Sequence, residues 1–402
     1  MALTYYIPDW DDRVDPDYDF QNDTHTPDRN PYRDDRYAHE IYDPPPYDGV
    51  LISRAVIDDD RKKHDRMIAA GSVHAYLRLP ADGDHFVLGD CGAFTYWQKE
   101  NPPYTTADML EYYQNLGFNY GVSIDHLIFT DDPEERQRRW VITIDNARDF
   151  LQHHRSGNYL FTPIGVAQGW DPTSYRRAAQ ELIQMGYSYI AVGGLVRSKT
   201  QDIIAILAAV QEVLRPDTQV HLFGVNRPEA MGTFARLGVT SFDSASRLRR
   251  AWMDDRQNYF LNDRAYRAIR IREARLLATK HQLDLDHTRQ LEQAALNALR
   301  AYDNNTCSLD QVLDAVIAYA ALFGDVTEAM SEGYRITLSE RPWKSCECAI
   351  CQAIGIEVII FRGNNRNRRR GFHNTWQLYQ QILKERAQPN SAAEIAFQDY
   401  LL

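Results

Sequence analysis

The chain has 402 residues, of which 44% are hydrophobic and 25% charged, so it can bury a substantial core as one large barrel domain with an appendage or as two ordinary domains. Its formal net charge of −11 argues against a protein that coats nucleic acid non-specifically, although a local basic face remains compatible with it. No apolar run approaches the roughly eighteen residues that a membrane helix needs, so we expect no membrane partner.

Residues 1–48 form an amino-terminal arm that is acidic, rich in Tyr and Pro, and almost without aliphatic periodicity. Such a segment cannot form a core of its own. Its many tyrosines favour docking over free disorder. We therefore expect this arm to lie extended over the body of the protein.

From Gly49 the sequence alternates between short apolar runs and amphipathic stretches. The expected strands are Val50–Ser53, Val73–Leu79, Phe86–Leu88, Tyr120–Ile124, Leu160–Val166, Tyr187–Val192, Val220–Phe223 and Val239–Phe242. The expected helices between them include Thr106–Leu116, Glu134–His153, Pro172–Met185, Gln201–Leu214 and Pro228–Leu237. This order predicts an α/β fold, a closed (β/α)8 TIM barrel over residues 49–243. The alternative is an open doubly wound sheet, although the Gly-rich phosphate fingerprint of dinucleotide folds is missing.

After the eighth expected strand the pattern becomes helical, over Asp263–His281, Leu285–Ala301 and Ser308–Phe323, and a last helix is expected from Thr375 to Arg386. We interpret residues 244–340 as a helical insertion. Residues 341–402 are interpreted as a zinc-binding subdomain together with the helix that closes the barrel.

Three of the five cysteines, Cys346, Cys348 and Cys351, are crowded into one short stretch, and His373 follows them. A C-x-C-x2-C cluster and one His supply three thiolates and an imidazole, which form a closed tetrahedral set for a structural Zn²⁺. The alternative is a disulfide framework, which suits short secreted chains, whereas this chain is long, has an odd number of cysteines and is expected to carry no signal peptide. Sparse cysteines and a zinc site predict a cytoplasmic location.

Polar side chains recur at the ends of the expected strands, as Asp90, Asp125, Gln168 and Asp243. In barrels of this kind the carboxyl ends of the strands carry the active site. Two carboxylates can share the cleavage of a glycosidic bond, one as nucleophile at the sugar carbon and one as general acid and base. A third carboxylate and an amide could hold the polar edge of a purine-like base, and the glycines at 193–194 would let the backbone approach it.

Each of these residues also has a purely structural interpretation. A single Asp at a strand end is most often the N-cap of the next helix, and Gln168–Gly169 can be a plain turn. Phe94 and Phe223 are individually more typical of a core than of a stacking clamp. The regular series at strand ends, followed by a zinc site, favours the functional interpretation.

With these motifs in place, the chain resembles the tRNA-guanine transglycosylase superfamily, barrel enzymes that exchange a guanine for a 7-deazaguanine base. The matching pieces over about residues 49–385 are VHAYLRLP, GDCGAF, SIDH, GVAQG, AVGGL, FGVNRPE, SFDS and the zinc ligands. Each motif is weak alone, but their common order together with the C-x-C-x2-C…H site is specific.

The resemblance implies that Asp243 is the nucleophile, which forms a covalent intermediate with the sugar, and that Asp90 is the general acid and base. The implied base-binding residues are Asp125, Gln168 and the backbone of Gly193, Gly194 and Leu195, with Phe94 and Phe223 stacking on the faces of the base. The implied zinc ligands are Cys346, Cys348, Cys351 and His373.

Several departures separate this chain from the tRNA enzymes. Those enzymes usually carry Ser-Gly-Gly-Phe-Gln after the first Asp, where this chain has the run from Cys91 to Thr95, and His126 replaces the usual acidic residue after Asp125. The long helical stretch and the acidic arm are also foreign to them. These features resemble the DNA 7-deazaguanine transglycosylases, which insert 7-cyano-7-deazaguanine (preQ0) into DNA. DNA is therefore the expected partner; action on tRNA and a catalytically silent nucleic-acid-binding barrel are the alternatives.

Two clusters of arginines are expected to contact the phosphates of the polynucleotide. They are Arg247, Arg249 and Arg250 just after Asp243, and Arg362, Arg366, Arg368, Arg369 and Arg370 in the zinc stretch. A solvated charge run on a loop is the alternative. The target guanosine must be extruded from a duplex or already be single-stranded, which leaves room for a partner protein that opens the DNA.

Overall fold

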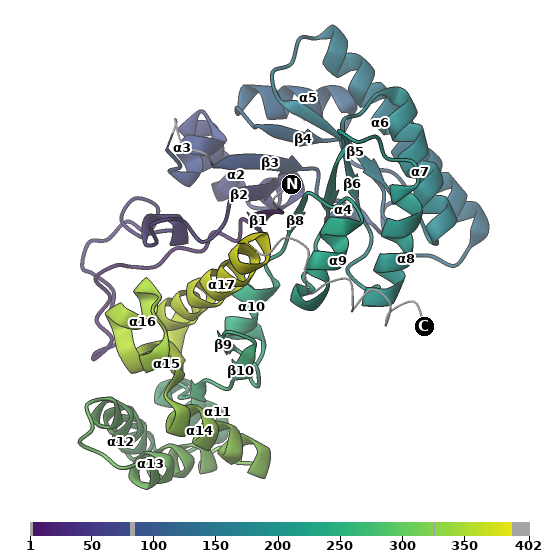
Figure 1. Ribbon diagram of the computed structural model, residues 1–402. Helices are drawn as coiled ribbons and strands as arrows, with labels where there is room; N and C mark the ends of the chain where they lie inside the picture. The colour runs from purple at the N-terminus through teal and green to yellow at the C-terminus, as the bar shows by residue number, and fades with distance from the viewer. Residues whose placement is uncertain (1–2, 81–84, 325, 388–402) are drawn as a thin grey trace. The chain divides into compact units, whose positions relative to one another are not determined.

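The computed structural model describes residues 3–80, 85–324 and 326–387 of the chain (Figure 1). The chain divides into two compact units. The first unit consists of Met1–Trp10, Tyr47–Ala245 and Ile382–Leu402, and the second of Asp11–Pro46 and Ser246–Gln381. Among the described residues, no helix combines the length and the hydropathy needed to cross a membrane.

The first unit is built on eight parallel strands that close into a barrel in chain order, with β8 pairing back to β1. The strands are β1 (Thr4–Pro8), β2 (Gly49–Ser53), β3 (Phe86–Asp90), β4 (Tyr120–Val122), β5 (Thr162–Ala167), β6 (Tyr189–Val192), β7 (Gln219–Leu222) and β8 (Ser241–Asp243). The register pairs Ser53 with Asp90 and Thr4 with Ser241. The predicted TIM barrel is thus confirmed, and the open sheet is excluded.

The identity of one strand was predicted wrongly. Val73–Leu79, expected to be the second strand, contains the helix α3 (Val73–Leu77) instead. The Ser72 side chain accepts a hydrogen bond from the Ala75 amide, and this N-cap starts a helix within a run of β-branched and aromatic residues. The missing strand is β1, which lies in the segment assigned to the arm; its Tyr5 and Tyr6 are buried in the barrel.

Helices cover the outside of the barrel, and Figure 1 shows α5 to α8 packed around the strands. The helices of this unit are α1 (Arg54–Asp58), α2 (Arg61–Ala70), α3, α4 (Ala93–Tyr96), α5 (Thr106–Asn115), α6 (Pro133–Ser156), α7 (Pro172–Met185), α8 (Thr200–Gln211) and α9 (Met231–Arg236), with the short η2 (Pro228–Ala230). Close packing needs glycines in the strands: a Cβ on Gly89 or Gly121 would lie 2.3 or 2.5 Å from the Tyr113 ring of α5.

A buried cluster of side chains from successive strands forms the core of the barrel. Its members are Tyr6, Leu51, Leu88, Val122, Ile164, Val166, Tyr189 and Ala191. Large rings in this cluster fill the interior, as is usual for a TIM barrel, whose centre is a packed core and not a pore. The strands are therefore rigid supports for whatever side chains stand at their ends.

The second unit is mainly helical, and its described residues also form two short two-stranded sheets. Its elements are η1 (Ala38–Glu40), α10 (Ser246–Met253), β9 (Tyr259–Leu261), β10 (Arg264–Tyr266), β11 (Ile269–Arg270), α11 (Ala274–His281), α12 (Leu285–Asp303), α13 (Leu309–Ala321), α14 (Glu328–Glu340), α15 (Pro342–Ser345), α16 (Ala349–Ile354), η3 (Gly355–Ile359), β12 (Ile360–Phe361) and α17 (Gly363–Ala387). Strands β9 and β10 pair antiparallel, and β11 pairs in parallel with β12.

Two helix predictions in this region need correction. The expected helix Asp263–His281 is helical only from Ala274, because β10 and β11 occupy its first part. The expected last helix is longer than predicted: α17 begins at Gly363, so it includes the arginines from 366 to 370. Its final residues belong to the first unit, where the Arg386 guanidinium donates to the Leu3 carbonyl and pairs with Asp48.

Candidate active site and metal site

The polar side chains predicted from the sequence stand at the carboxyl ends of barrel strands. Asp90 and Asp243 are the last residues of β3 and β8, and Asp125 and Gln168 follow β4 and β5. The strands of a closed parallel barrel all end at the same rim, so these four side chains gather there. The structure therefore brings the three carboxylates and the amide into one site.

Asp90 has the properties of a group that exchanges protons. Its pKa is raised to about 7 by burial and by the negative charges of Asp125 and Asp243. Its Oδ2 accepts a hydrogen bond of 3.0 Å from the Gly92 amide, and the residue remains partly exposed. A carboxyl group that titrates near neutral pH can both donate and accept a proton during one reaction cycle.

Asp125 is buried, and protein groups already contact both of its oxygens. Its Oδ1 lies 3.1 Å from the Cys91 thiol and its Oδ2 accepts a 2.6 Å hydrogen bond from the Gln168 Nε2. Burial raises the pKa of Asp125. The Cys91 sulfur also accepts a hydrogen bond of 3.0 Å from the Tyr96 hydroxyl. The sequence left the role of Cys91 open, and the structure shows that its thiol helps to hold the Asp125 carboxyl in place.

Gln168 presents an unsatisfied acceptor next to this carboxyl. The side chain is 1% exposed, yet its Oε1 has no hydrogen-bond partner among the described residues. A buried acceptor without a partner costs roughly 1–3 kcal/mol, so a water molecule or a ligand that donates a hydrogen bond to Oε1 would be stabilised there. A ligand that carries N–H donors along one edge fits this position.

The glycines after β6 keep the space around Gln168 open. A Cβ on Gly193 would lie 2.4 Å from the Gln168 Nε2, and a Cβ on Gly194 would lie 2.6 Å from its Oε1. Gly194 also has a φ of +77°, which strains any other residue. Leu195 follows them as a buried side chain. The backbone at Gly193 and Gly194 thus lies directly against the side-chain amide of Gln168.

Asp243 is held by two donors on one oxygen. Its Oδ1 accepts a 2.8 Å hydrogen bond from the Gly224 amide and lies 3.2 Å from the His221 Nε2. The Oδ2 has no partner among the described residues. His221 was missed by sequence reasoning, although an imidazole inside the apolar run of β7, two residues before Phe223, was a signal that could have identified it.

The two aromatic residues expected to stack on the base occupy different surroundings. Phe94 is 49% exposed and its ring lies 5.7 Å from that of Phe129. Phe223 is partly buried, packs against the barrel core and lies 4.7 Å from the His221 ring. His126 is buried and turned towards the Lys99 carbonyl, at 2.9 Å.

The prediction that the arginines of α17 contact nucleic acid is wrong for the buried ones. Arg366, Arg369 and Arg370 are buried, and their guanidinium groups bind protein atoms. Arg366 pairs with Asp23 and Glu357, and Arg370 donates to backbone carbonyls that include Val358 O at 3.1 Å. The sequence could not reveal this because a run of charge on a helix is normally solvated.

The partly buried members of the same run also have acidic partners within the second unit. Arg362 pairs with Asp23 and with Glu292 at 2.8 Å, and Arg368 lies 3.5 Å from Asp12. The arginines of α17 thus fasten the acidic segment of residues 11–46 to this unit. Acidic residues of that segment and basic residues of the run therefore form ion pairs with one another.

We expect Arg366→Ala to destabilise the protein by about 1.5–3 kcal/mol, because Asp23 and Glu357 each lose one charged hydrogen-bond donor and keep only Arg362 and Arg300, respectively. Chemical denaturation followed by circular dichroism measures this loss. The matched control is Arg250→Ala, an exposed arginine of α10, which should change stability by less than about 0.5 kcal/mol. An Arg366→Ala protein of unchanged stability that no longer binds polynucleotide would restore the original interpretation.

The arginines of α10 remain accessible. Arg250 is exposed, and Arg247 and Arg249 are partly so. The Arg247 guanidinium lies 3.8 Å from the centre of the Phe260 ring, and that of Arg250 lies 5.8 Å from it. These residues can still contact phosphates.

The second unit contains a compact group of metal ligands. Cys346, Cys348, Cys351 and His373 are buried, and their ligand atoms lie within 4.8 Å of one another. The His373 Nδ1 lies 3.3–3.5 Å from the three sulfurs, while its Nε2 contacts the Phe260 carbonyl at 2.6 Å. The three cysteines are free thiols, which excludes the disulfide alternative for them. The group can hold a metal ion.

Local structure presents these ligands in the right orientation. Cys348 is the N-cap of α16 and accepts the Cys351 amide at 3.3 Å, which places two sulfurs on one turn. Tyr259 stacks on His373 with ring centres 4.1 Å apart. A hydrogen bond from the far nitrogen of a histidine ligand to a carbonyl fixes the ring and its tautomer, as in established metal sites.

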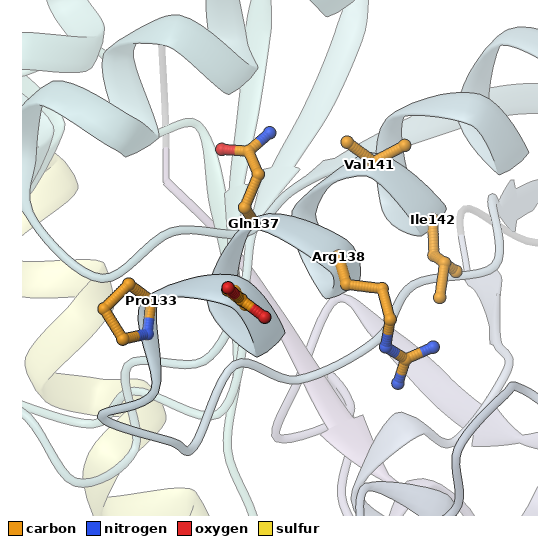
Figure 2. A pocket seen from close by; sticks show the side chains of 6 residues that line it. Pro133, Gln137, Arg138, Val141 and Ile142 are labelled. Atoms are coloured by element: carbon orange, nitrogen blue, oxygen red, sulfur yellow. The ribbon is translucent and has the colours of Figure 1, made fainter.

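The first unit has an apolar hollow on the surface of α6, and its lining includes no residue of the candidate active site. Its lining consists of Pro133, Glu134, Gln137, Arg138, Val141 and Ile142. Figure 2 shows the hollow from close by. None of the residues predicted from the sequence to act in catalysis or binding takes part in it. The chemistry therefore gathers at the strand ends and not in this hollow.

Comparison with known proteins places this geometry in context. A family model described as queuine tRNA-ribosyltransferase matches residues 58–298. A DNA-guanine transglycosylase of Salmonella montevideo is 43% identical over 94% of this chain and 96% of its own length. A tRNA-guanine(15) transglycosylase of Pyrococcus abyssi is 26% identical over 50% of this chain and 34% of its own length, and one of Methanopyrus kandleri is 25% identical over 50% and 43%.

Proposed function

The chain belongs to the queuine tRNA-ribosyltransferase family and is a guanine transglycosylase, and from this premise we propose that it replaces guanine in DNA with a 7-deazaguanine such as preQ0. The similarity to the Salmonella DNA-guanine transglycosylase extends over almost the whole chain, whereas that to the archaeal tRNA enzymes covers about half. This difference supports DNA over tRNA as the polynucleotide.

The observation that carries the proposal is the pair of carboxylates with different environments. Asp243 has one oxygen in contact with the Gly224 amide and the His221 Nε2, and its other oxygen has no hydrogen-bond partner within the part of the chain that the structure describes, which suits a nucleophile. Asp90 has a pKa of about 7, which suits a general acid and base. Two carboxylates at the site of a glycosidic bond can divide the roles of nucleophile and of general acid and base between them.

The reaction proceeds in two displacements at C1′ of the target nucleoside. Asp243 Oδ2 bonds to C1′, the bond from C1′ to guanine breaks, and its electron pair leaves with the base, which receives a proton from Asp90. The incoming 7-deazaguanine then loses a proton to Asp90 and bonds to C1′, and Asp243 departs as a carboxylate. Atoms and charge balance, and Asp90 returns to its starting state.

Base recognition falls to the residues around Gln168. Asp125 and the Gln168 Oε1 accept hydrogen bonds from the N–H groups of the base, and the backbone from Gly193 to Leu195 lies along its edge. Phe94 and Phe223 are the candidates for the two faces. Guanine and 7-deazaguanines share the amide edge that these acceptors would recognise, so one pocket serves both the leaving and the incoming base.

Exposed aromatic rings at the barrel rim support a polynucleotide substrate. Among the described residues of the barrel unit, the exposed aromatic side chains are Trp10, Phe86, Phe94 and Trp170. All but Phe86 follow the carboxyl end of a strand, as do the active-site residues. Arg197, exposed after β6, stacks over Phe129 at 4.9 Å. Aromatic rings and arginines are what unpaired bases and phosphates bind.

The test of the function is a direct comparison of substrates. The protein is incubated with labelled guanine and either plasmid DNA or bulk tRNA, and label is counted in each polynucleotide. We expect label in DNA and its release when preQ0 is added. Label in tRNA alone would establish the alternative tRNA activity. No label and no covalent protein–nucleic acid adduct with either would leave a non-catalytic binding module.

For the metal group we propose Zn²⁺, because three thiolates and one imidazole form the tetrahedral set that this ion prefers. Bound there, the ion would crosslink the chain around α16 and α17 and supply folding energy. The donor set uses four protein ligands and leaves no position for a substrate, so the role proposed is structural.

We expect Cys348→Ala to lose one equivalent of zinc and to unfold the second unit, because the binding energy of a structural metal is folding energy. Elemental analysis and circular dichroism measure the two effects. The control is Cys307→Ala, a cysteine outside the group, which should keep its metal. A metal-free Cys348→Ala protein with wild-type stability would contradict a structural role.

A further inference from the structure

A continuous chain of hydrogen bonds inside the barrel ends on Asp243. The Tyr189 hydroxyl lies 2.6 Å from the Ser241 Oγ, which lies 2.8 Å from the His221 Nδ1. The His221 Nε2 in turn lies 3.2 Å from the Asp243 Oδ1. The exposed fractions of the four residues are 3%, 2%, 0% and 6%, so the hydrogen bonds of this chain are shielded from bulk water.

The chemistry of the groups gives this chain a direction. An ionised Asp243 can only accept, so the His221 Nε2 must carry the hydrogen. In a neutral imidazole the Nδ1 is then an acceptor, which takes the Ser241 hydroxyl hydrogen. The Ser241 oxygen accepts from Tyr189, and burial raises the pKa of that phenol and keeps it protonated. Each member fixes the orientation of the next.

We infer that His221 is a positioning residue that holds Asp243 with Oδ1 engaged and Oδ2 turned free for attack on the sugar. The inference rests on the proposed function. The Gly224 amide donates to the same Oδ1 at 2.8 Å, so both donors act on one oxygen. The Tyr6 and Phe223 rings meet His221 edge to face at 5.8 and 4.7 Å, which fixes the plane of the imidazole.

The same arrangement serves both displacements. When Asp243 Oδ2 bonds to C1′, Oδ1 becomes the carbonyl oxygen of an ester and keeps its two donors. When the incoming base bonds to C1′, the electron pair of the breaking bond returns to the carboxylate of Asp243. Donors already placed on Oδ1 stabilise that returning charge without reorganisation, as preorganised donors do elsewhere. His221 transfers no proton in either step.

The experiment compares two substitutions of His221 in the full-length protein. His221→Phe removes both hydrogen bonds but keeps a ring in place. His221→Gln keeps an N–H that can reach Asp243 and an oxygen that can meet Ser241. The readouts are the single-turnover rate of covalent adduct formation with DNA, the rate of base exchange, and the KM for guanine.

We expect His221→Phe to slow both adduct formation and exchange by about 10- to 100-fold, the effect of losing a hydrogen bond to a charged group, with KM for guanine unchanged. His221→Gln should recover a large part of the rate. A matched control is His154→Phe. The His154 Nε2 lies 2.7 Å from the Phe161 carbonyl, just before the amino end of β5 and away from the carboxyl ends of the strands, so this variant should have unchanged rates.

A folded His221→Phe protein with wild-type rates would overturn the inference, and so would equal losses in the Phe and Gln variants, since packing alone would then explain them. If His221→Phe does not fold, Ser241→Ala removes the donor to Nδ1 and should slow adduct formation by about 10-fold; an unchanged rate overturns the inference as well. Failure of the wild-type protein to form any adduct would instead overturn the proposed function itself.

Discussion

Replacing Asp243 with Asn should abolish base exchange, with a loss of at least about a thousand-fold, because the amide cannot form the bond to C1′. Asn has nearly the same shape as Asp, and its Oδ1 can still accept the hydrogen bonds that His221 and Gly224 offer. The fold should therefore remain intact. Incorporation of labelled guanine into DNA measures the exchange, and a denaturing gel shows whether the covalent adduct has disappeared.

The matched control for this substitution is Asp217→Asn, which makes the same chemical change at an exposed position in the turn before β7. Its activity should equal that of the wild-type protein. Adduct formation by the Asp243→Asn protein would assign the nucleophile to another residue, and Asp90 is the carboxylate that would then have to be tested. Loss of the metal or of the fold in Asp243→Asn would mean that the residue has a structural part as well.

The grouping of the candidate site residues could be predicted from the sequence because strand ends in a parallel barrel are equivalent positions. Asp90, Asp125, Gln168 and Asp243 each follow an apolar run, and the closed barrel brings such positions to one rim. The group that can hold a metal could be predicted as well, because Cys346, Cys348 and Cys351 are close in sequence and only His373 comes from elsewhere. Local spacing carries this kind of information.

The errors arose where the outcome depends on contacts between distant segments. The strand β1 lies in an acidic segment with little aliphatic character, and only pairing with β2 and β8 makes it a strand. The arginines from 362 to 370 look like a solvated run, but Asp23, far away in sequence, pairs with Arg362 and Arg366, and Glu292 also pairs with Arg362. Neither partner can be recognised from the run itself.

His221 was missed for a related reason. A histidine inside a short apolar strand is more often a satisfied core residue, and its link to Asp243 appears only when β7 and β8 lie side by side. The pKa of Asp90 is likewise a property of the assembled site, because it depends on burial and on two carboxylates from other strands. The sequence shows which acidic residues stand at strand ends, whereas their hydrogen bonds and pKa values depend on neighbours that only the closed barrel brings close.

That pKa leads to a prediction that separates catalysis from stability. Asp90→Asn should reduce exchange by at least about a thousand-fold, because neither the departing nor the incoming base then finds its proton donor or acceptor. The wild-type rate of adduct formation should fall as the pH rises through about 7, where Asp90 loses the proton that it must give to guanine. A pH–rate profile of adduct formation measures this dependence.

The same substitution should make the protein more stable at alkaline pH. The pKa of Asp90 is about 7 in the folded chain against an ordinary value of 3.8, so the folded state binds the proton more tightly than the unfolded state. Wild-type stability is therefore lost progressively as the pH rises from about 4 to about 7. Asn does not titrate, so the Asp90→Asn protein does not lose stability in this way. The difference in free energy of unfolding between the variant and the wild type should therefore grow over that pH range and level off above it, at no more than about 4 kcal/mol.

Denaturation midpoints of the two proteins at pH 5 and pH 8 provide the measurement, with Asp217→Asn as the control that should show no such gain. A midpoint difference that is equal at both values of pH would mean that Asp90 does not titrate in this range, and its part as acid and base would have to be given up. We expect the Asp90→Asn protein to be inactive but more stable than the wild type at pH 8. A carboxyl group that is held close to other carboxylates is needed for the reaction, but it lowers the stability of the folded protein when it is ionised.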